Sequence, residues 1–190
     1  MTGIRVLIAF AVFLPLAAQT KIAEWNCTAG IPENMSSYIN TPGGAAAIIT
    51  HDASADTPTG RGALKITITK GSLSESDSDV QLSFVHKDGL VKGKKYRVAV
   101  TLRAQRSLAL PVRLSVIQNT SPWAAVNAPF ESYAPNGRYS LPKREWETIS
   151  LRFTAAGDCA REVRAPCVFL GMLDTGSIIW IESVLLESMD

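Results

Sequence analysis

The sequence predicts an all-β protein, an antiparallel β-sandwich of the jelly-roll type that follows an N-terminal signal peptide. Three observations support this fold class. Apolar and polar residues alternate in a series of short segments from Gly60 to the C-terminus. Turn residues separate these segments at spacings of roughly ten to fifteen residues. β-Branched residues are abundant, and helical periodicity is absent outside the first eighteen residues.

The first eighteen residues are typical of a secretory signal peptide. Arg5 supplies a short basic region, and residues 6–18 form an apolar run that ends in two alanines before Gln19. The run is too short to span a membrane, although a retained N-terminal anchor is the alternative. We therefore expect a secreted or periplasmic protein, with residues 19–190 as a single domain and no membrane partner after cleavage.

The charge of the chain argues against a nucleic-acid partner. The 190 residues include 19 basic and 17 acidic side chains, and loss of Arg5 with the signal peptide lowers the formal net charge from +2 to +1. The one dense basic cluster, at residues 92–95, is typical of a solvated turn. Nucleic-acid binding requires a much stronger positive field.

The expected export of the chain also affects the expected oxidation state of its three cysteines. Cys159 and Cys167 lie eight residues apart, on either side of a polar segment. We expect a disulfide between them, because an oxidising compartment would preserve a bridge that clamps two neighbouring strands. Cys27 would then pair with one of the others, stay buried and free, or join a partner chain in a larger extracellular assembly. Three cysteines with only two histidines do not match a structural zinc site.

The first part of the mature chain is expected to contain little regular structure. Residues 23–37 read as an irregular entry segment. A Gly43-Gly44 turn then leads into a strand that ends at Thr50, and the polar residues 51–62 are expected to form a loop.

Each strand expected after that loop places its apolar residues on one face. These strands lie at residues 63–69, 80–86, 96–103, 112–117, 146–154, 167–173 and 178–186. Between them we expect a Ser- and Asp-rich loop over 71–79, a turn-rich connector over 88–94 and a long loop over 119–142.

The motifs within these strands occur in a known order. Residues 90–104 read LVKGKKYRVAVTLRA, residues 146–154 read WETISLRFT, and residues 180–186 read WIESVLL. From Gly60 to Leu186 the chain resembles the jelly-roll carbohydrate-binding modules of families four, nine and twenty-two. The resemblance implies a core filled by Leu90 and a carbohydrate ligand. Most such modules are appended to a glycoside hydrolase, whereas we expect this one to be free-standing.

The resemblance also implies a possible structural calcium ion. The last strand of these modules usually carries Asp-Asp or Asp-Asn, where this chain has Glu182 and Ser183. Glu182 keeps one carboxylate as a candidate metal ligand, but calcium requires several oxygen ligands. No other cofactor is expected.

Aromatic residues gather in the long loop, where residues 119–139 contain Trp123, Phe130, Tyr133 and Tyr139. The apolar faces of sugar rings stack on aromatic side chains. Trp123, Tyr133 and Tyr139 are therefore candidates for carbohydrate binding. Phe130 is expected to plug the end of the sandwich.

Polar side chains on the strands provide the second set of candidates. Gln81, Arg103 and Arg113 lie on faces opposite the apolar residues. If that face is concave, these side chains line a groove and bond sugar hydroxyls; otherwise they belong to an ordinary solvated face. Trp146 and Trp180 stand at framework positions of the resemblance, so we expect them to have packing roles.

The sequence offers little for catalysis. No pair of carboxylates stands out for glycoside hydrolysis, and no serine-nucleophile motif is present. We therefore expect a secreted, non-catalytic module that recognises a polysaccharide or glycan. The alternatives are a structural or adhesion β-sandwich that binds another protein and, less favoured, a small glycan hydrolase.

Overall fold

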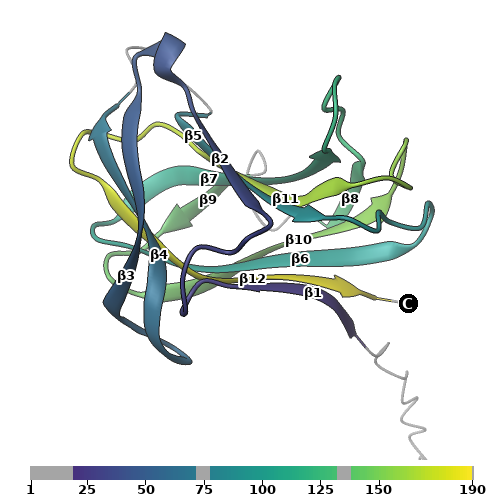
Figure 1. Ribbon diagram of the computed structural model, residues 1–190, viewed down its shortest axis with the longest axis horizontal. Coiled ribbons are helices and arrows are strands. Elements are labelled where there is room, and N and C mark those ends of the chain that lie inside the picture. Colours follow the sequence, from purple (N-terminus) through teal and green to yellow (C-terminus); the bar gives the residue numbers. More distant parts are fainter. Residues whose placement is uncertain (1–18, 72–77, 132–137, 190) are drawn as a thin grey trace, which may run out of the picture.

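The computed structural model describes residues 19–189 except 72–77 and 132–137. These residues form two antiparallel sheets packed face to face, as Figure 1 shows, which confirms the predicted fold class. A single 3-10 turn, η1 (Thr41–Gly43), interrupts the strands of the described chain. None of the described helical residues makes a segment long and apolar enough to cross a membrane. The predicted signal peptide lies outside the described residues.

The larger sheet has seven strands in the order β3-β4-β12-β6-β10-β8, with β1 paired to β12. Its strands are β1 (Thr20–Asn26), β3 (Ala46–Thr57), β4 (Gly60–Lys70), β6 (Lys95–Ala104), β8 (Asn127–Glu131), β10 (Trp146–Ala155) and β12 (Ile178–Ser188).

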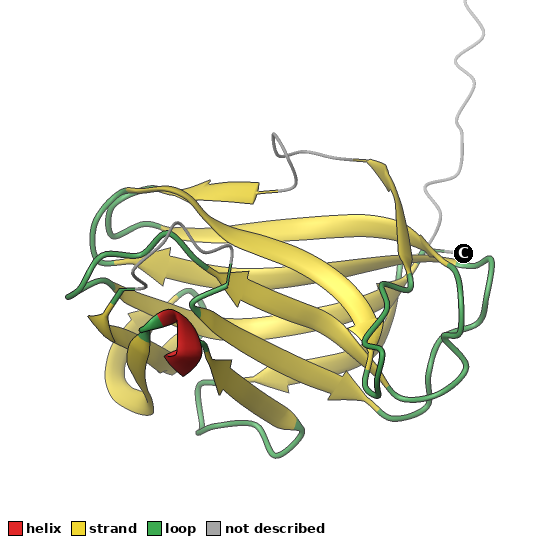
Figure 2. Ribbon diagram, turned by 90° about the horizontal axis from the view of Figure 1, so that it is seen from above, coloured by secondary structure: helices red, strands yellow, loops and turns green. Residues whose placement is uncertain are grey.

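The smaller sheet has five strands in the order β2-β5-β11-β7-β9. Its strands are β2 (Met35–Ile39), β5 (Val80–His86), β7 (Leu108–Gln118), β9 (Arg138–Leu141) and β11 (Val163–Leu170). Figure 2 shows the molecule from above, with the strands of the two sheets running in similar directions.

The core lies between the sheets and follows from the alternating pattern of the strands. Leu82 and Phe84 of β5 are fully buried against the larger sheet, and the Phe84 ring meets Trp25 edge-on at a centroid distance of 5.9 Å. Leu90 is buried as the resemblance implies. The Tyr96 hydroxyl accepts a hydrogen bond from the Val91 backbone N–H at 3.0 Å, which holds the connector before β6.

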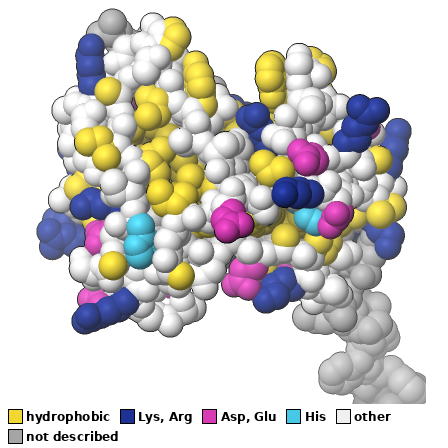
Figure 3. Space-filling view, viewed as in Figure 1, with side chains coloured by type: hydrophobic (Ala, Val, Ile, Leu, Met, Phe, Trp, Pro, Cys, Tyr) yellow, Lys and Arg dark blue, Asp and Glu magenta, His cyan; other side chains and the backbone are white. Residues whose placement is uncertain are grey.

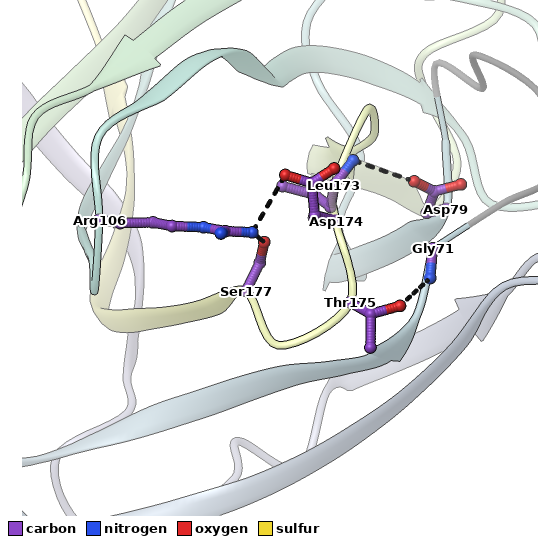
Figure 4. Close-up of polar contacts among 7 residues, drawn as sticks. All are labelled: Gly71, Asp79, Arg106, Leu173, Asp174, Thr175 and Ser177. Atoms are coloured by element: carbon purple, nitrogen blue, oxygen red, sulfur yellow. Dashed lines mark hydrogen bonds and ion pairs between the residues drawn. The ribbon is translucent and has the colours of Figure 1, made fainter.

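Hydrogen bonds fix the connection between β11 and β12 to both sheets at one end of the sandwich (Figure 4). The Arg106 guanidinium donates to Asp174 at 3.1 Å and to Ser177 at 2.9 Å. The backbone N–H of Leu173 donates to the buried Asp79 carboxylate at 3.4 Å. Asp79 leads into the smaller sheet and Arg106 follows a strand of the larger one, so the contacts link the two layers.

Residues 19–60 contain more strand than the sequence predicts. The segment expected to be irregular includes β1, which pairs with β12, and β2, which pairs with β5. The expected polar loop at 51–62 is largely a hairpin of β3 and β4, in which Thr57 pairs with Gly60. β2 is too short to show a period, and the far part of the hairpin is solvated, so neither carries the pattern of one buried face.

The predicted long loop over 119–142 also contains two short strands, β8 and β9. β8 pairs with β10 in the larger sheet, and β9 pairs with β7 in the smaller one. Pro, Asn and Gly residues in this stretch favour turns, and strands of four or five residues give no clear alternation.

The prediction of a disulfide between Cys159 and Cys167 is wrong, because all three cysteines are free and buried. Cys159 belongs to the core between the sheets, whereas Cys167 lies on the outer face of the smaller sheet with Ile117 and Phe169. The Cys167 sulfur is 3.7 Å from the Ser83 hydroxyl. Cys167 occupies an outward position of β11, so its side chain points away from the core. Cys27 is buried and free, one of the alternatives left open by the sequence.

Cys27 gives the folding free energy a pH dependence at alkaline pH. Burial raises the pKa of its thiol from 9.0 to about 12. The unfolded chain loses this proton near pH 9 while the folded chain keeps it, so the contribution to stability is complete below pH 9. It then falls by roughly 1.4 kcal/mol per pH unit until about pH 12. Urea unfolding between pH 8 and 10.5 will measure this decline. It is expected to be shallower in Cys27→Ala; an equal decline in both proteins would contradict the assignment.

Candidate functional site

A groove lies on the outer face of the five-stranded sheet, with a volume of about 700 Å³. Four neighbouring strands, β2, β5, β11 and β7, form its base, and the β7–β8 connection forms one wall. In Figure 1 this connection rises on one side of the sheet and η1 rises on the other. Figure 3 shows a notch in the upper outline between these two lobes, with hydrophobic side chains on both sides of it. We call this feature the outer-face groove.

Strand register builds one row of side chains across the groove. Tyr38 pairs with Gln81, Gln81 with Phe169, and Phe169 with Arg113. Paired residues project from the same face, so these four side chains stand side by side on successive strands. The row crosses four strands, and neighbouring strands lie about 4.8 Å apart, so it is about 14 Å long. Tyr38, at the edge of the sheet, is 49% exposed and offers its ring to solvent.

The loop after β7 positions Trp123 above the other end of the groove. Its backbone N–H donates to the Thr120 carbonyl at 2.8 Å, and the side chain is 52% exposed. The φ of Trp123 is +52°, a left-handed conformation that is uncommon for a bulky residue. Asn119 anchors this loop by accepting a hydrogen bond from Arg164 Nε at 3.0 Å and donating to Glu162 at 2.9 Å. The indole is therefore held out on a loop that is fixed to the sheet.

Two arginines approach the middle of the groove. The Arg113 guanidinium carbon lies 4.1 Å from the centre of the Phe169 ring, a cation–π stack. Burial raises the pKa of the Cys167 thiol, and the Ser83 hydroxyl and the charges of Arg164 and Arg113 act in the opposite direction. An interaction with the Arg164 side chain also lowers the pKa of this thiol.

The outer-face groove combines aromatic faces with hydrogen-bonding side chains. Trp123 and Tyr38 present aromatic faces, which stack on the C–H faces of sugar rings. The Gln81 amide and the arginines supply hydrogen-bond donors for hydroxyl oxygens. No Asp or Glu occurs among the described residues that line the groove.

Three of the predicted binding residues, Trp123, Gln81 and Arg113, come together in this groove. Two further lining residues, Tyr38 and Arg164, were not identified from the sequence. Tyr38 lies on the short strand β2, in which two consecutive serines precede it, so the sequence shows no alternation of apolar and polar residues there. Arg164 stands in a segment that the sequence assigned to a connection between strands.

Arg103 lies on the opposite side of the molecule, on the outer face of the seven-stranded sheet. Its guanidinium carbon is 4.9 Å from the centre of the Trp146 ring and 4.7 Å from that of Trp180. The Trp180 indole N–H donates to Asp52 at 3.0 Å, and that of Trp146 donates to the Asp56 carbonyl at 2.9 Å. The two tryptophans thus pack on Arg103 rather than in the central core, and this cluster does not contribute to the groove.

We predict that Arg103→Ala lowers the free energy of unfolding by about 1–2 kcal/mol, because two cation–π contacts are lost. Glycan binding should be unchanged, since the groove is on the other sheet. Urea unfolding and calorimetric titration will measure the two effects. Arg61→Ala serves as the control, because the Arg61 side chain is 78% exposed. A loss of binding in Arg103→Ala with unchanged stability would contradict this placement.

Tyr139 and Tyr133 are not found among the described groove residues. Tyr139 is partly buried in β9, and its hydroxyl donates to the Ser150 carbonyl of β10 at 2.5 Å, which links the two sheets. Burial raises the pKa of the Tyr139 hydroxyl. Tyr133 lies outside the described residues.

Glu182, the candidate calcium ligand, is 2% exposed on β12. One of its carboxylate oxygens accepts two hydrogen bonds from Thr59, at 2.9 Å from the backbone N–H and 2.7 Å from the hydroxyl. In the part of the chain that the structure describes, no group of three or more His, Cys, Asp or Glu could hold a metal ion. Calcium at Glu182 therefore stays a prediction.

Comparison with known proteins shows the same architecture elsewhere. No family model matches the chain, and no curated protein matches it. A solved structure described as "CBM4 structure and function" is 18% identical, with a TM-score of 0.57 over 81% of this chain and 86% of that chain. The CBM22-1 xylan-binding domain from Paenibacillus barcinonensis Xyn10C is 10% identical, with a TM-score of 0.58 over 92% and 99%.

A third similar structure is the K1 cleaved adhesin domain of Lys-gingipain from Porphyromonas gingivalis W83. It is 12% identical, with a TM-score of 0.51 over 89% of this chain and 97% of that chain. At these identities the likeness concerns the fold. It confirms the resemblance noted in the sequence: the chain has the jelly-roll fold of carbohydrate-binding modules such as those of families 4 and 22.

Proposed function

We propose that residues 19–190 form a secreted, non-catalytic module that binds a polysaccharide or glycan in the outer-face groove. The observation that carries this proposal is the pair of half-exposed aromatic rings, Trp123 and Tyr38, in a groove whose other lining includes hydrogen-bonding side chains. Carbohydrate sites combine these two kinds of contact, because a sugar ring has apolar faces and a rim of hydroxyls. The likeness to a xylan-binding domain supports the same ligand class.

The absence of catalysis is supported by the lining of the groove. A glycosidase of the common type needs two carboxyl groups on either side of the scissile bond. The described groove lining has none, and the nearby Glu162 is hydrogen-bonded to Asn119. Secretion is supported by the signal-like character of the first eighteen residues.

Affinity electrophoresis of residues 19–190 tests the proposal directly. Native gels would contain xylan, mixed-linkage β-glucan, polygalacturonate, alginate or starch, and insoluble cellulose and chitin would be used in pull-down assays. We expect at least one polymer to retard the protein, with no release of reducing sugar during long incubation. Failure of every polymer to retard or retain it would refute carbohydrate binding, and release of reducing sugar would refute the non-catalytic assignment.

Adhesion to another protein is the second candidate, and the likeness to the adhesin domain of Lys-gingipain is the observation that favours it. The two functions place different demands on the groove. Glycan binding should be lost when Trp123 is truncated, whereas binding of a protein through another face should survive that change.

A further inference from the structure

The charges in the outer-face groove are all of one sign. Arg113 and Arg164 line it, and none of the described lining residues is acidic. Figure 3 shows Lys or Arg atoms at the base of the notch, between hydrophobic side chains on both sides. Arg97 of the larger sheet, by contrast, is paired with Glu187 at 2.8 Å. The two positive charges of the groove therefore have no acidic counter-charge among its described lining residues.

Arg113 forms no ion pair with any of the described residues. Its guanidinium stacks on Phe169, and its Nε is buried without a hydrogen bond among the described residues. A stacked guanidinium is held in one orientation, and its planar donors match the two oxygens of a carboxylate. A partly desolvated, unpaired charge is unfavourable until a counter-charge arrives. An anionic ligand group would supply it.

Arg164 is oriented toward the same place. Its Nε donates to Asn119 at 3.0 Å, and its guanidinium also interacts with the Cys167 thiol, which lowers the pKa of that thiol. A guanidinium has five N–H donors, so donors remain for a ligand. The nearest acidic group in this network, Glu162, is held by the other end of the Asn119 amide at 2.9 Å. Arg164 on β11 and Arg113 on the neighbouring strand β7 both line the groove.

We propose that the outer-face groove selects an acidic glycan, with a carboxylate of a uronic acid residue bound between Arg113 and Arg164. Neighbouring sugar rings stack on Trp123 and Tyr38 at the two sides. This inference rests on the proposed function, because it specifies the ligand of the same groove. It adds a requirement that glycan binding alone does not impose, namely a negative charge on the sugar.

Matched pairs of polymers test this requirement. Polygalacturonate, glucuronoxylan and alginate would each be compared with their carboxyl-reduced forms by affinity electrophoresis, and oligosaccharides of the best binder by calorimetric titration. We expect the strongest binder to be acidic and its affinity to fall roughly tenfold or more on carboxyl reduction, which removes a charge-assisted pair. Binding of the acidic form should also weaken as salt is raised.

Two arginine variants and two controls connect this effect to the groove. Arg113→Gln and Arg164→Gln should each lower the affinity for the acidic oligosaccharide to near that of its reduced form. Trp123→Ala should weaken both forms. Arg61→Gln, which changes an exposed arginine on the other sheet, should change neither.

The outcomes separate this inference from the proposed function. If neutral polymers bind as tightly as acidic ones, or if carboxyl reduction has no effect, the acidic-glycan proposal is overturned while glycan binding stands. The same holds if Arg61→Gln weakens binding as much as Arg113→Gln, because the attraction would then be a non-specific charge effect. If no polymer binds, both proposals fail.

Discussion

Replacing Trp123 with alanine is expected to weaken glycan binding at least tenfold and to leave the fold intact. The indole is 52% exposed and stands above the groove on a loop anchored to the sheet. Covering an aromatic ring of this size with a sugar ring stabilises a complex by roughly 1.5–3 kcal/mol, or about 10- to 150-fold in affinity. Calorimetric titration with an oligosaccharide of the retarding polymer will measure the loss. Trp123→Phe should retain part of the affinity, because it keeps an aromatic face.

Ile48→Ala provides the matched control for this experiment. Ile48 is a large apolar residue of β3 with a similar exposure, 54%, but it lies on the seven-stranded sheet. Its removal should leave affinity unchanged. Equal affinities for wild type and Trp123→Ala would exclude Trp123 from the binding site.

Truncation of Phe84 is expected to have the largest effect on stability, a loss of about 3–5 kcal/mol in the free energy of unfolding. The ring is fully buried between the sheets and packs edge-on against Trp25. Alanine would leave a cavity that the surrounding strands cannot fill, since both sheets constrain their positions. Urea unfolding followed by tryptophan fluorescence will report it.

Val91→Ala is the corresponding surface control, since Val91 is 58% exposed and its truncation should change stability by less than about 0.5 kcal/mol. Phe84→Leu should fall between the two variants. If Phe84→Ala costs less than about 1 kcal/mol, the packing of β5 against the larger sheet is wrong.

The strands that the sequence predicts well are those with one buried face. In β5 and β6 every second residue enters the core, so Leu82, Phe84, Val98 and Val100 show a period of two. The far part of the β3–β4 hairpin lacks this pattern because it extends into solvent. The polar residues of this hairpin therefore predict a loop when only the sequence is considered.

The candidate site could be predicted only in part, because sequence does not say which sheet has the open face. Gln81, Arg113 and Arg103 have the same outward placement on their strands. The pairing order of the strands puts the first two in the same row as Tyr38 in the groove. It puts Arg103 between two tryptophans on the other sheet. That order depends on contacts between residues distant in the chain.

The cysteines illustrate a second limit of prediction from the sequence. A separation of eight residues permits a bridge, but the direction of each side chain decides whether it forms. The pairing of β11 with its neighbours is irregular between Arg164 and Cys167, and Cys167 faces outward beside Ser83. Such irregularities leave no clear trace in the sequence.

The four tryptophans allow one measurement of where a glycan binds. Their indole N–H groups give separate signals in a two-dimensional NMR spectrum, and each marks a different part of the molecule: Trp25 the core, Trp123 the groove, and Trp146 and Trp180 the opposite sheet. On titration with a binding oligosaccharide, we expect the Trp123 signal to shift together with the Gln81 side-chain amide, while the other three indoles stay in place. A shift of Trp146 and Trp180 with an unmoved Trp123 would contradict the outer-face groove as the binding site.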